Sequence, residues 1–180
     1  MKIVAISLLF SMLACNTQDQ NKQQVIPESG DFSESNINLS EERMALIKSY
    51  TAPLIIDTSF LWKDTVYTLT LKHFSSMDSG LTIPAKYNFD TNTAFTTHNF
   101  KSQLILVKQG DTVINKEITK DTFKKSLTPE FESYGTLLFP ALRIKNDAIE
   151  IGYSLSIPVT DVGIPVAILF RTNGSYEIAE

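Results

Sequence analysis

Apolar and polar residues alternate along several stretches of the second half of the chain. The clearest alternation runs over residues 148–158, where Ile, Tyr and Leu occupy every second position. Successive side chains of a β-strand point to opposite faces, so this pattern predicts an antiparallel strand with one buried face and one face in water. Residues 54–74, 103–118 and 136–145 are rich in β-branched and aromatic residues and predict further strands.

Short turn signals separate these predicted strands. Gly, Asn and Asp tolerate the left-handed backbone conformation that tight hairpin turns require. Residues 81–89 predict an extended segment, which Pro84 assigns to the edge of a sheet. The turns are predicted at Lys63-Asp64, Gln109 to Asp111, Asn146-Asp147 and Thr172 to Ser175.

Three segments have helical rather than alternating character. Residues 39–50 carry Ser40, which favours a helix N-cap, and acidic residues follow it. Residues 119–127 and 128–135 are short helix candidates that follow the middle hairpin. With about eight strands, the sequence predicts a mainly β fold: an antiparallel β-sandwich or a strongly curved sheet with one or two short helices. We expect a single domain over residues 39–180.

The chain begins with a different pattern. Met1 and Lys2 bring positive charge, residues 3–13 are apolar except for two serines, and Ala14 is a small residue directly before Cys15. This layout is typical of a secretory signal peptide, here over residues 1–14. Spanning about 30 Å of hydrocarbon takes about 20 apolar residues. The run is too short for that, so we expect it to direct export.

Residues 12–15, Met-Leu-Ala-Cys, resemble a bacterial lipobox, the motif that is cleaved directly before a cysteine. The resemblance implies that Cys15 is lipidated on its sulfur and anchors the mature protein to a membrane. Met12 and Leu13 depart from the residues most common in this motif. The alternative is an ordinary signal peptide, with Cys15 left as an incidental thiol. By the same resemblance, Asn16 favours the outer membrane of the cell envelope over the inner one.

Residues 15–38 connect this cysteine to the predicted domain. After Cys15 the segment is polar, rich in Gln and Asn, and its scattered apolar residues follow no period. Such a segment cannot bury enough apolar surface to offset the entropy lost on ordering, so the sequence predicts a disordered tether. The alternative is that Val25-Ile26-Pro27 or Phe32 docks on a partner or on the domain itself.

Charge and motif content exclude several function classes. The net charge is −4, whereas a nucleic-acid partner would require a basic face. Cys15 is the only cysteine, so no intrachain disulfide can form. The short motifs of nucleotide-binding proteins, zinc proteases and serine hydrolases do not occur in the sequence, and neither a cofactor nor a metal site is predicted.

His73 and His98 are the only histidines and therefore the first candidates for catalytic chemistry. A metal site would combine them with acids such as Asp57, Asp64 or Asp90. The alternative is that both histidines lie at the surface or are half-buried, with local hydrogen bonds only.

Aromatic residues are concentrated in the first half of the predicted domain and form the second set of candidates. Rings exposed on a strand can stack on a sugar or hold a peptide, while strand alternation would place most of them in the core. Trp62, next to the predicted Lys63-Asp64 turn, is the ligand-binding candidate.

The stretch GDTVINKEITKDTFKKSL resembles a segment of small lipoproteins of Bacteroidota that carry a domain of unknown function. The matching residues are the turn at Gly110 to Thr112, the helix start at Ile118 to Asp121, and Phe123. The resemblance covers about residues 100–180 and implies no activity.

Two functions therefore remain. The first is a lipid-anchored, non-enzymatic envelope protein that binds a protein, peptide or glycan through a sheet edge or an aromatic patch. The alternative is an envelope hydrolase, metal-assisted or not, that uses His73 or His98. This alternative requires a histidine and at least two acids facing one cleft.

Overall fold

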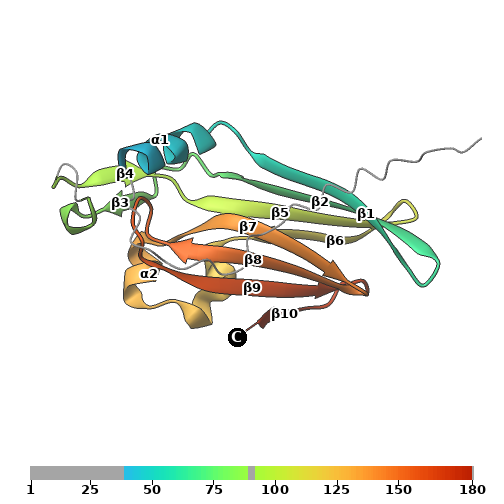
Figure 1. Ribbon diagram of the computed structural model, residues 1–180. Coiled ribbons are helices and arrows are strands. Elements are labelled where there is room, and N and C mark those ends of the chain that lie inside the picture. Colours follow the sequence, from blue (N-terminus) through green and yellow to red (C-terminus); the bar gives the residue numbers. More distant parts are fainter. Residues whose placement is uncertain (1–38, 89–91, 180) are drawn as a thin grey trace, which may run out of the picture. The chain divides into compact units, whose positions relative to one another are not determined.

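The computed structural model describes residues 39–88 and 92–179 (Figure 1). The predicted signal peptide, Cys15 and the predicted tether lie outside the described residues, and so does Asp90. Within the described part of the chain, no helix combines the length and the apolarity needed to cross a bilayer.

The first large sheet has four strands in the order β1-β2-β5-β6, and every neighbouring pair is antiparallel. Lys63-Asp64 joins β1 to β2, as predicted. Gln109-Gly110 joins β5 to β6, one residue shorter than the predicted turn, because Asp111 already pairs with Lys108 in the sheet. All four turn residues have positive φ, which matches the right-handed twist of tightly connected antiparallel strands. The bounds are Leu54–Trp62 for β1, Thr65–Ser75 for β2, Phe100–Lys108 for β5 and Asp111–Ile118 for β6.

The second large sheet has the order β10-β9-β8-β7, so strands adjacent in sequence are adjacent in the sheet. The predicted turns at Asn146-Asp147 and Thr172 to Ser175 join its hairpins. Between Leu138 and Ala141 the register of β7 against β8 shifts. Two residues of β7 thus oppose one residue of β8, which is a β-bulge. The bounds are Thr136–Lys145 for β7, Ala148–Ser156 for β8, Gly163–Arg171 for β9 and Tyr176–Ala179 for β10.

Shorter elements complete the described fold. β3 and β4 form a separate two-stranded sheet. The predicted extended segment over residues 81–89 is shorter than expected, because Pro84 ends β3 and a 3-10 turn follows it. The sequence did not predict β4. The bounds are Leu39–Ser49 for α1, Leu81–Ile83 for β3, Ala85–Tyr87 for η1, Phe95–Thr97 for β4, Lys120–Ser126 for η2 and Pro129–Tyr134 for α2.

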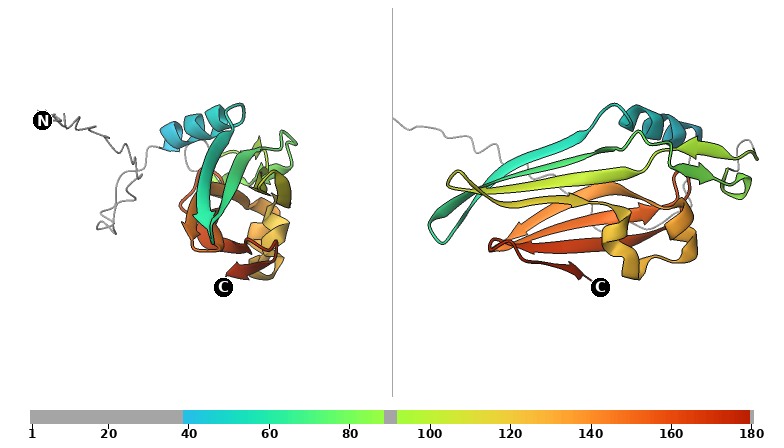
Figure 2. Two further views of the ribbon diagram at one scale, coloured as in Figure 1. Left: turned by 90° about the vertical axis from the view of Figure 1, so that its right-hand side faces the viewer. Right: turned by 180° about the vertical axis from the view of Figure 1, so that it is seen from behind.

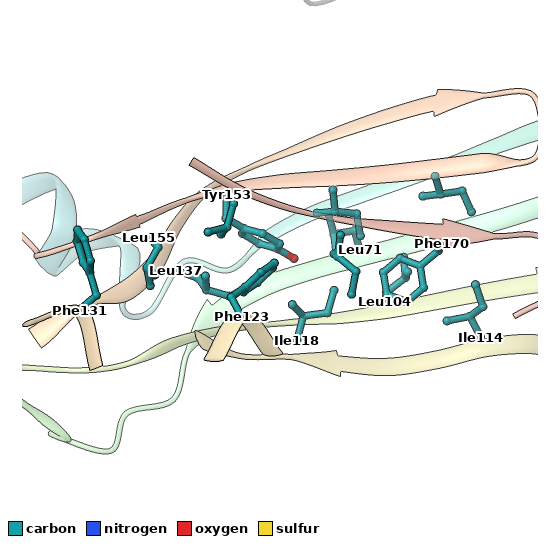
Figure 3. Packing of buried hydrophobic residues seen from close by; sticks show 14 of the residues in the cluster. Leu71, Leu104, Ile114, Ile118, Phe123, Phe131, Leu137, Tyr153, Leu155 and Phe170 are labelled. Atoms are coloured by element: carbon teal, nitrogen blue, oxygen red, sulfur yellow. The ribbon is translucent and has the colours of Figure 1, made fainter. Parts of the chain in front are cut away.

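The two large sheets pack face to face as two layers (Figures 1 and 2). Side chains from both sheets and from η2 meet between the layers (Figure 3), and among them Leu71, Leu104, Phe123 and Phe170 are fully buried. The fold is therefore mainly β, an antiparallel β-sandwich with few short helices, which is the first of the two architectures predicted from the sequence.

The inward positions change character along the sandwich. On β2 the buried side chains are first those of Tyr67, Leu69 and Leu71, and then those of His73 and Ser75. The polar positions lie at the end of the sheets where α1 is found, which we call the α1 end (Figure 1). The opposite end carries the four hairpin turns, and we call it the hairpin end.

Candidate functional site

An apolar groove of about 490 Å³ opens at the α1 end of the sandwich. Its walls come from α1, the start of β1, the β7 bulge and the loop between β8 and β9. Its volume is in the range of small-ligand pockets, and none of the described side chains that line it is an acid, a lysine or an arginine. The lining residues are Ala45, Leu46, Ser49, Leu54, His73, Phe100, Leu138, Phe139, Pro140, Ser156, Ile157, Val159 and Thr160.

Two residues of the groove wall have strained backbone conformations. Phe139 in the β7 bulge has φ +50°, and Val159 in the β8–β9 loop has φ +62°. Positive φ is unfavourable for residues with a Cβ atom, and for a β-branched residue such as Val159 it is rare. The bulge leaves Phe139 78% exposed. Strained residues persist only where the surrounding structure holds them, and they cluster at binding sites.

α1 is held against the sandwich by Tyr50, the residue that follows it. The Tyr50 ring meets the His98 ring edge to face, with centroids 4.6 Å apart, and lies 6.1 Å from the Phe100 ring. Its hydroxyl forms a hydrogen bond with Thr97 Oγ1. A helix of 11 residues is marginally stable alone in water. These contacts of Tyr50 therefore position the α1 wall of the groove.

His73 lies between the layers and is only 7% exposed. Its Nδ1 is 2.9 Å from Oγ of Ser102, the residue opposite it on β5. The His73 ring also stacks on Phe100, with centroids 5.5 Å apart. Burial lowers the pKa of His73 to about 4, because a poorly solvated site disfavours the imidazolium form. His73 is therefore neutral at pH 7, so the described side chains of the groove carry no charge.

Tyr153 on β8 approaches His73 from the second sheet, with ring centroids 6.1 Å apart. Figure 3 shows Tyr153 facing Phe123 between the layers, and their centroids are 6.0 Å apart. Burial raises the pKa of Tyr153 to about 12, while the nearby Ser102 side chain acts in the opposite direction. The Tyr153 hydroxyl makes no hydrogen bond of normal geometry with a described residue. His73, Ser102 and Tyr153 thus form one buried polar cluster next to the groove.

The second histidine, His98, has local contacts. Its Nδ1 accepts a hydrogen bond from the Ser79 backbone N–H at 2.8 Å, and its ring supports Tyr50. Asp57, one of the suggested metal ligands, accepts a hydrogen bond from Thr70 Oγ1 at 2.6 Å. Over residues 39–88 and 92–179, no three side chains of His, Asp or Glu come together as a metal site would require.

Trp62, the ligand-binding candidate from the sequence, lies at the far end of β1 from the groove, opposite Thr65. It is half-buried, and it packs against the hydrophobic core. The Lys63 ammonium group lies 5.4 Å from the centre of the Trp62 ring. Trp62 is not among the residues that line the groove of its own chain, and its role in ligand binding stays a prediction.

A second hollow of about 330 Å³ lies at the hairpin end and has a charged lining. Arg143 pairs with Glu150 at 3.3 Å, and Arg171 pairs with Asp147 at 3.7 Å. Both arginines and both acids of this hollow are thus paired and exposed, which leaves Lys145 as the one charge of its described lining outside these ion pairs. We therefore regard the apolar groove as the candidate site.

No protein-family model matches the chain, and the search of curated proteins also finds no match. The candidate site therefore rests on the geometry of the groove.

Sequence reasoning missed Phe139, although a signal for it was present. Residues 136–145 contain the run Leu137 to Pro140, which has the composition of a buried strand. Pro140 was the useful sign, because proline within a strand marks an edge or a bulge. The bulge on edge strand β7 turns Phe139 away from the core.

Proposed function

We propose that this protein is a lipid-anchored component of the bacterial cell envelope whose β-sandwich binds an apolar peptide segment in the groove. The observation that carries the ligand class is the groove lining, whose described side chains are mainly apolar and include no acid, lysine or arginine. Phe139 adds an exposed ring held outward by the bulge. An apolar side chain gains about 1.5–3 kcal/mol on full burial, so two or three of them would support a weak to moderate affinity.

The same lining disfavours the other ligand classes. An anionic ligand would find no cation among the described side chains of the groove, because His73 is neutral at pH 7. A glycan would bring many hydroxyl groups, each of which needs a hydrogen-bond partner when it leaves water. The groove offers few such partners, mainly the hydroxyls of Ser49, Ser156 and Thr160. A peptide with adjacent apolar side chains fits these walls best.

The anchor is supported by the sequence of the first 15 residues, in which a signal-like segment ends in Met-Leu-Ala-Cys. Its test is Cys15→Ser in the exported full chain, followed by membrane fractionation. We expect the wild-type chain in the membrane pellet and the variant in the soluble fraction, or retained as an uncleaved precursor of higher mass. A processed Cys15→Ser chain that stays in the membrane would exclude the lipid anchor.

The groove is tested by selecting binders from a random-peptide phage library on the full chain in mild detergent. We expect the selected peptides to share two or three adjacent apolar residues and to lose most of their binding to Phe139→Asp. The matched control is Tyr176→Asp, because Tyr176 is also an exposed aromatic residue (49%) but does not line the groove. Equal binding to wild type and Phe139→Asp would remove the groove as the site.

The hydrolase alternative keeps one observation in its favour, the hydrogen-bonded pair of His73 and Ser102 beside the groove. Ser102 is fully buried, so a substrate would reach His73 first. Hydrolysis of ester or peptide substrates that is lost in His73→Gln and kept in His98→Gln would favour this alternative over binding alone.

A further inference from the structure

The two large sheets have four edge strands, β1, β6, β7 and β10. An open edge presents unpaired backbone N–H and C=O groups to any other strand, and proteins usually block such edges. β10 has only four residues. β7 carries Pro140 in its bulge, and the register of β6 shifts at Val113. Three of the four edges are therefore short or irregular.

β1 has none of these protections. It has nine residues and pairs with β2 without a register shift. It contains no Pro and no Gly, and Asp57 is its only charged residue. Leu54, Ile55 and Leu61 are 46%, 52% and 65% exposed. Among the described residues, only β2 makes backbone hydrogen bonds with β1. β1 is thus a long, regular and largely apolar open edge.

The sequence of β1 is symmetric in polarity about Thr58. Three apolar residues precede the polar triplet Asp57-Thr58-Ser59, and three apolar residues follow it. An antiparallel copy of such a strand places apolar residues against apolar residues and polar residues against polar residues. We propose that β1 pairs with β1 of a second copy of this chain across a two-fold axis at Thr58, which joins the two first sheets into one continuous sheet.

In β1 the residues with backbone groups directed to the open edge are the ones that this pairing needs. A two-residue turn makes Trp62 and Thr65 a hydrogen-bonded pair, so every second residue before Trp62 uses its backbone groups toward β2. The residues between them, Ile55, Asp57, Ser59 and Leu61, direct N–H and C=O to the open edge. With the axis at Thr58 these groups face each other and form about eight hydrogen bonds between the copies.

The side chains also match in this register. Ile55 faces the partner's Leu61, and Asp57 faces the partner's Ser59, whose hydroxyl can donate to the carboxylate. An axis at Asp57 would instead place two aspartates directly opposite each other, which destabilises a strand pair. An axis at Ser59 would place Asp57 opposite the partner's Leu61. The charge of Asp57 therefore selects the axis at Thr58.

The pairing has a consequence for Trp62, which rests on the proposed function of the groove. Leu54 and Trp62 lie on the same face of β1 because they are an even number of residues apart. In the dimer Leu54 faces the partner's Trp62, and Leu54 lines the groove. Each copy would then place its Trp62 beside the groove of the other copy.

A single cysteine tests the axis. Thr58 and the partner's Thr58 form a non-hydrogen-bonded pair, with Cα atoms about 4.5 Å apart, within reach of a disulfide. We expect Thr58→Cys in the full chain to give a covalent dimer when membranes are treated with a mild oxidant. The controls are Ile55→Cys and Leu61→Cys, because each cysteine would lie about 20 Å from its copy. The wild-type chain serves as the control for cross-linking through Cys15. Equal cross-linking of all three variants would reflect random collision and would overturn the proposal.

Charge substitution at Ser59 tests the register without a covalent bond. Ser59→Asp places a second carboxylate opposite the partner's Asp57, and Ser59→Lys places an ammonium group there. In sedimentation equilibrium of the full chain in detergent, we expect Ser59→Asp to weaken the dimer by about tenfold and Ser59→Lys to preserve it. A wild-type chain that is monomeric at all concentrations, or two variants with equal affinity, would contradict the proposal. Ser59 does not line the groove, so peptide binding to the monomeric variant still tests the proposed function separately.

Discussion

The two ends of the sandwich bury different residues between the same strands. At the hairpin end the inward positions of both sheets are apolar, and Leu69, Leu106 and Phe170 are almost completely buried. At the α1 end His73 and Ser102 occupy equivalent inward positions. The first sheet therefore changes from apolar to polar inward side chains along its length, whereas the second sheet stays apolar at the α1 end, where Leu137 and Leu155 are fully buried.

The difference shows which part of the fold can be used for binding. Apolar side chains at the hairpin end gain stability from burial without needing specific partners. At the α1 end each buried polar group needs a partner, and the Phe100 N–H donates to Thr136 Oγ1 at 2.7 Å for this reason. The groove and the strained Phe139 and Val159 are found at this second end. We infer that the apolar positions along both sheets supply most of the stability and that the α1 end, where polar side chains join them, carries the site.

The largest expected effect is the difference in stability between a phenylalanine-to-alanine substitution at the hairpin end and one at the α1 end. Phe170→Ala should lower the free energy of unfolding by about 3–5 kcal/mol, because it removes a fully buried ring. Phe139→Ala should cost less than about 1 kcal/mol, since surface substitutions away from the core have small effects. Urea unfolding measures both values. For binding of the selected peptides we expect the larger loss from Phe139→Ala. If Phe139→Ala lowered the free energy of unfolding as much as Phe170→Ala does, Phe139 would belong to the core.

The second effect is a pH dependence specific to the α1 end. The unfolded chain protonates His73 near pH 6.5, while the folded protein resists protonation until about pH 4. Stability from neutral His73 is thus complete above pH 6.5 and is lost as the pH falls toward 4, by about 2 kcal/mol between pH 7 and pH 5.

The measurement is urea unfolding at pH 7 and pH 5, with His73→Gln as the comparison. The glutamine amide can keep a hydrogen bond to Ser102 but does not titrate. We expect the variant to lose less stability than wild type over this interval. An equal loss in both chains would show that other groups cause the acid sensitivity.

A smaller effect tests backbone strain at the groove. Glycine usually destabilises a protein relative to alanine, but it accepts positive φ without steric cost. At Val159, where φ is +62°, we expect Val159→Gly to be more stable than Val159→Ala by about 1 kcal/mol. Thermal unfolding of the two variants gives the difference. If Val159→Ala were instead the more stable variant, the loop would relax around residue 159 and the positive φ would cost no stability.

The smallest effect belongs to the charged hollow at the hairpin end. Arg171 pairs with Asp147 and lies 3.5 Å from Glu177 Oε1, and all three side chains are exposed. Arg171→Gln should cost about 0.5 kcal/mol at low salt and almost nothing in 1 M salt. Thermal unfolding at two salt concentrations measures this. Peptide binding in the groove should not weaken with salt, because its described lining is uncharged. A strong salt dependence of peptide binding would contradict the assignment of an apolar ligand to the groove.

The sequence predicted the sandwich well because local chemistry decides most of it. Asn146-Asp147 and Gln109-Gly110 form turns through backbone preferences that act within a few residues. Alternation along β8 then sets which face is buried, since a shift of one residue would expose every apolar side chain.

The groove could not be predicted in the same way. It forms where α1, the β7 bulge and the β8–β9 loop meet, and no local rule connects these segments. Tyr50 fixes α1 through rings that lie far from it in the sequence. The sequence favoured Trp62 because it is an aromatic residue next to a turn, whereas the exposed aromatic residue at the groove is Phe139.

Each large sheet comes from one continuous segment, residues 54–118 for the first and residues 136–179 for the second. This separation sets an order in time during synthesis. All strands of the first sheet are synthesised before any strand of the second. The apolar inner faces of β2 and β5 therefore stay unpacked until the second sheet is made. At about 5–20 residues per second, the ribosome needs several seconds to complete the second sheet. During that interval the apolar inner faces of β2 and β5 have no second sheet against them, and a chaperone that keeps the exported chain from aggregating would have to cover them.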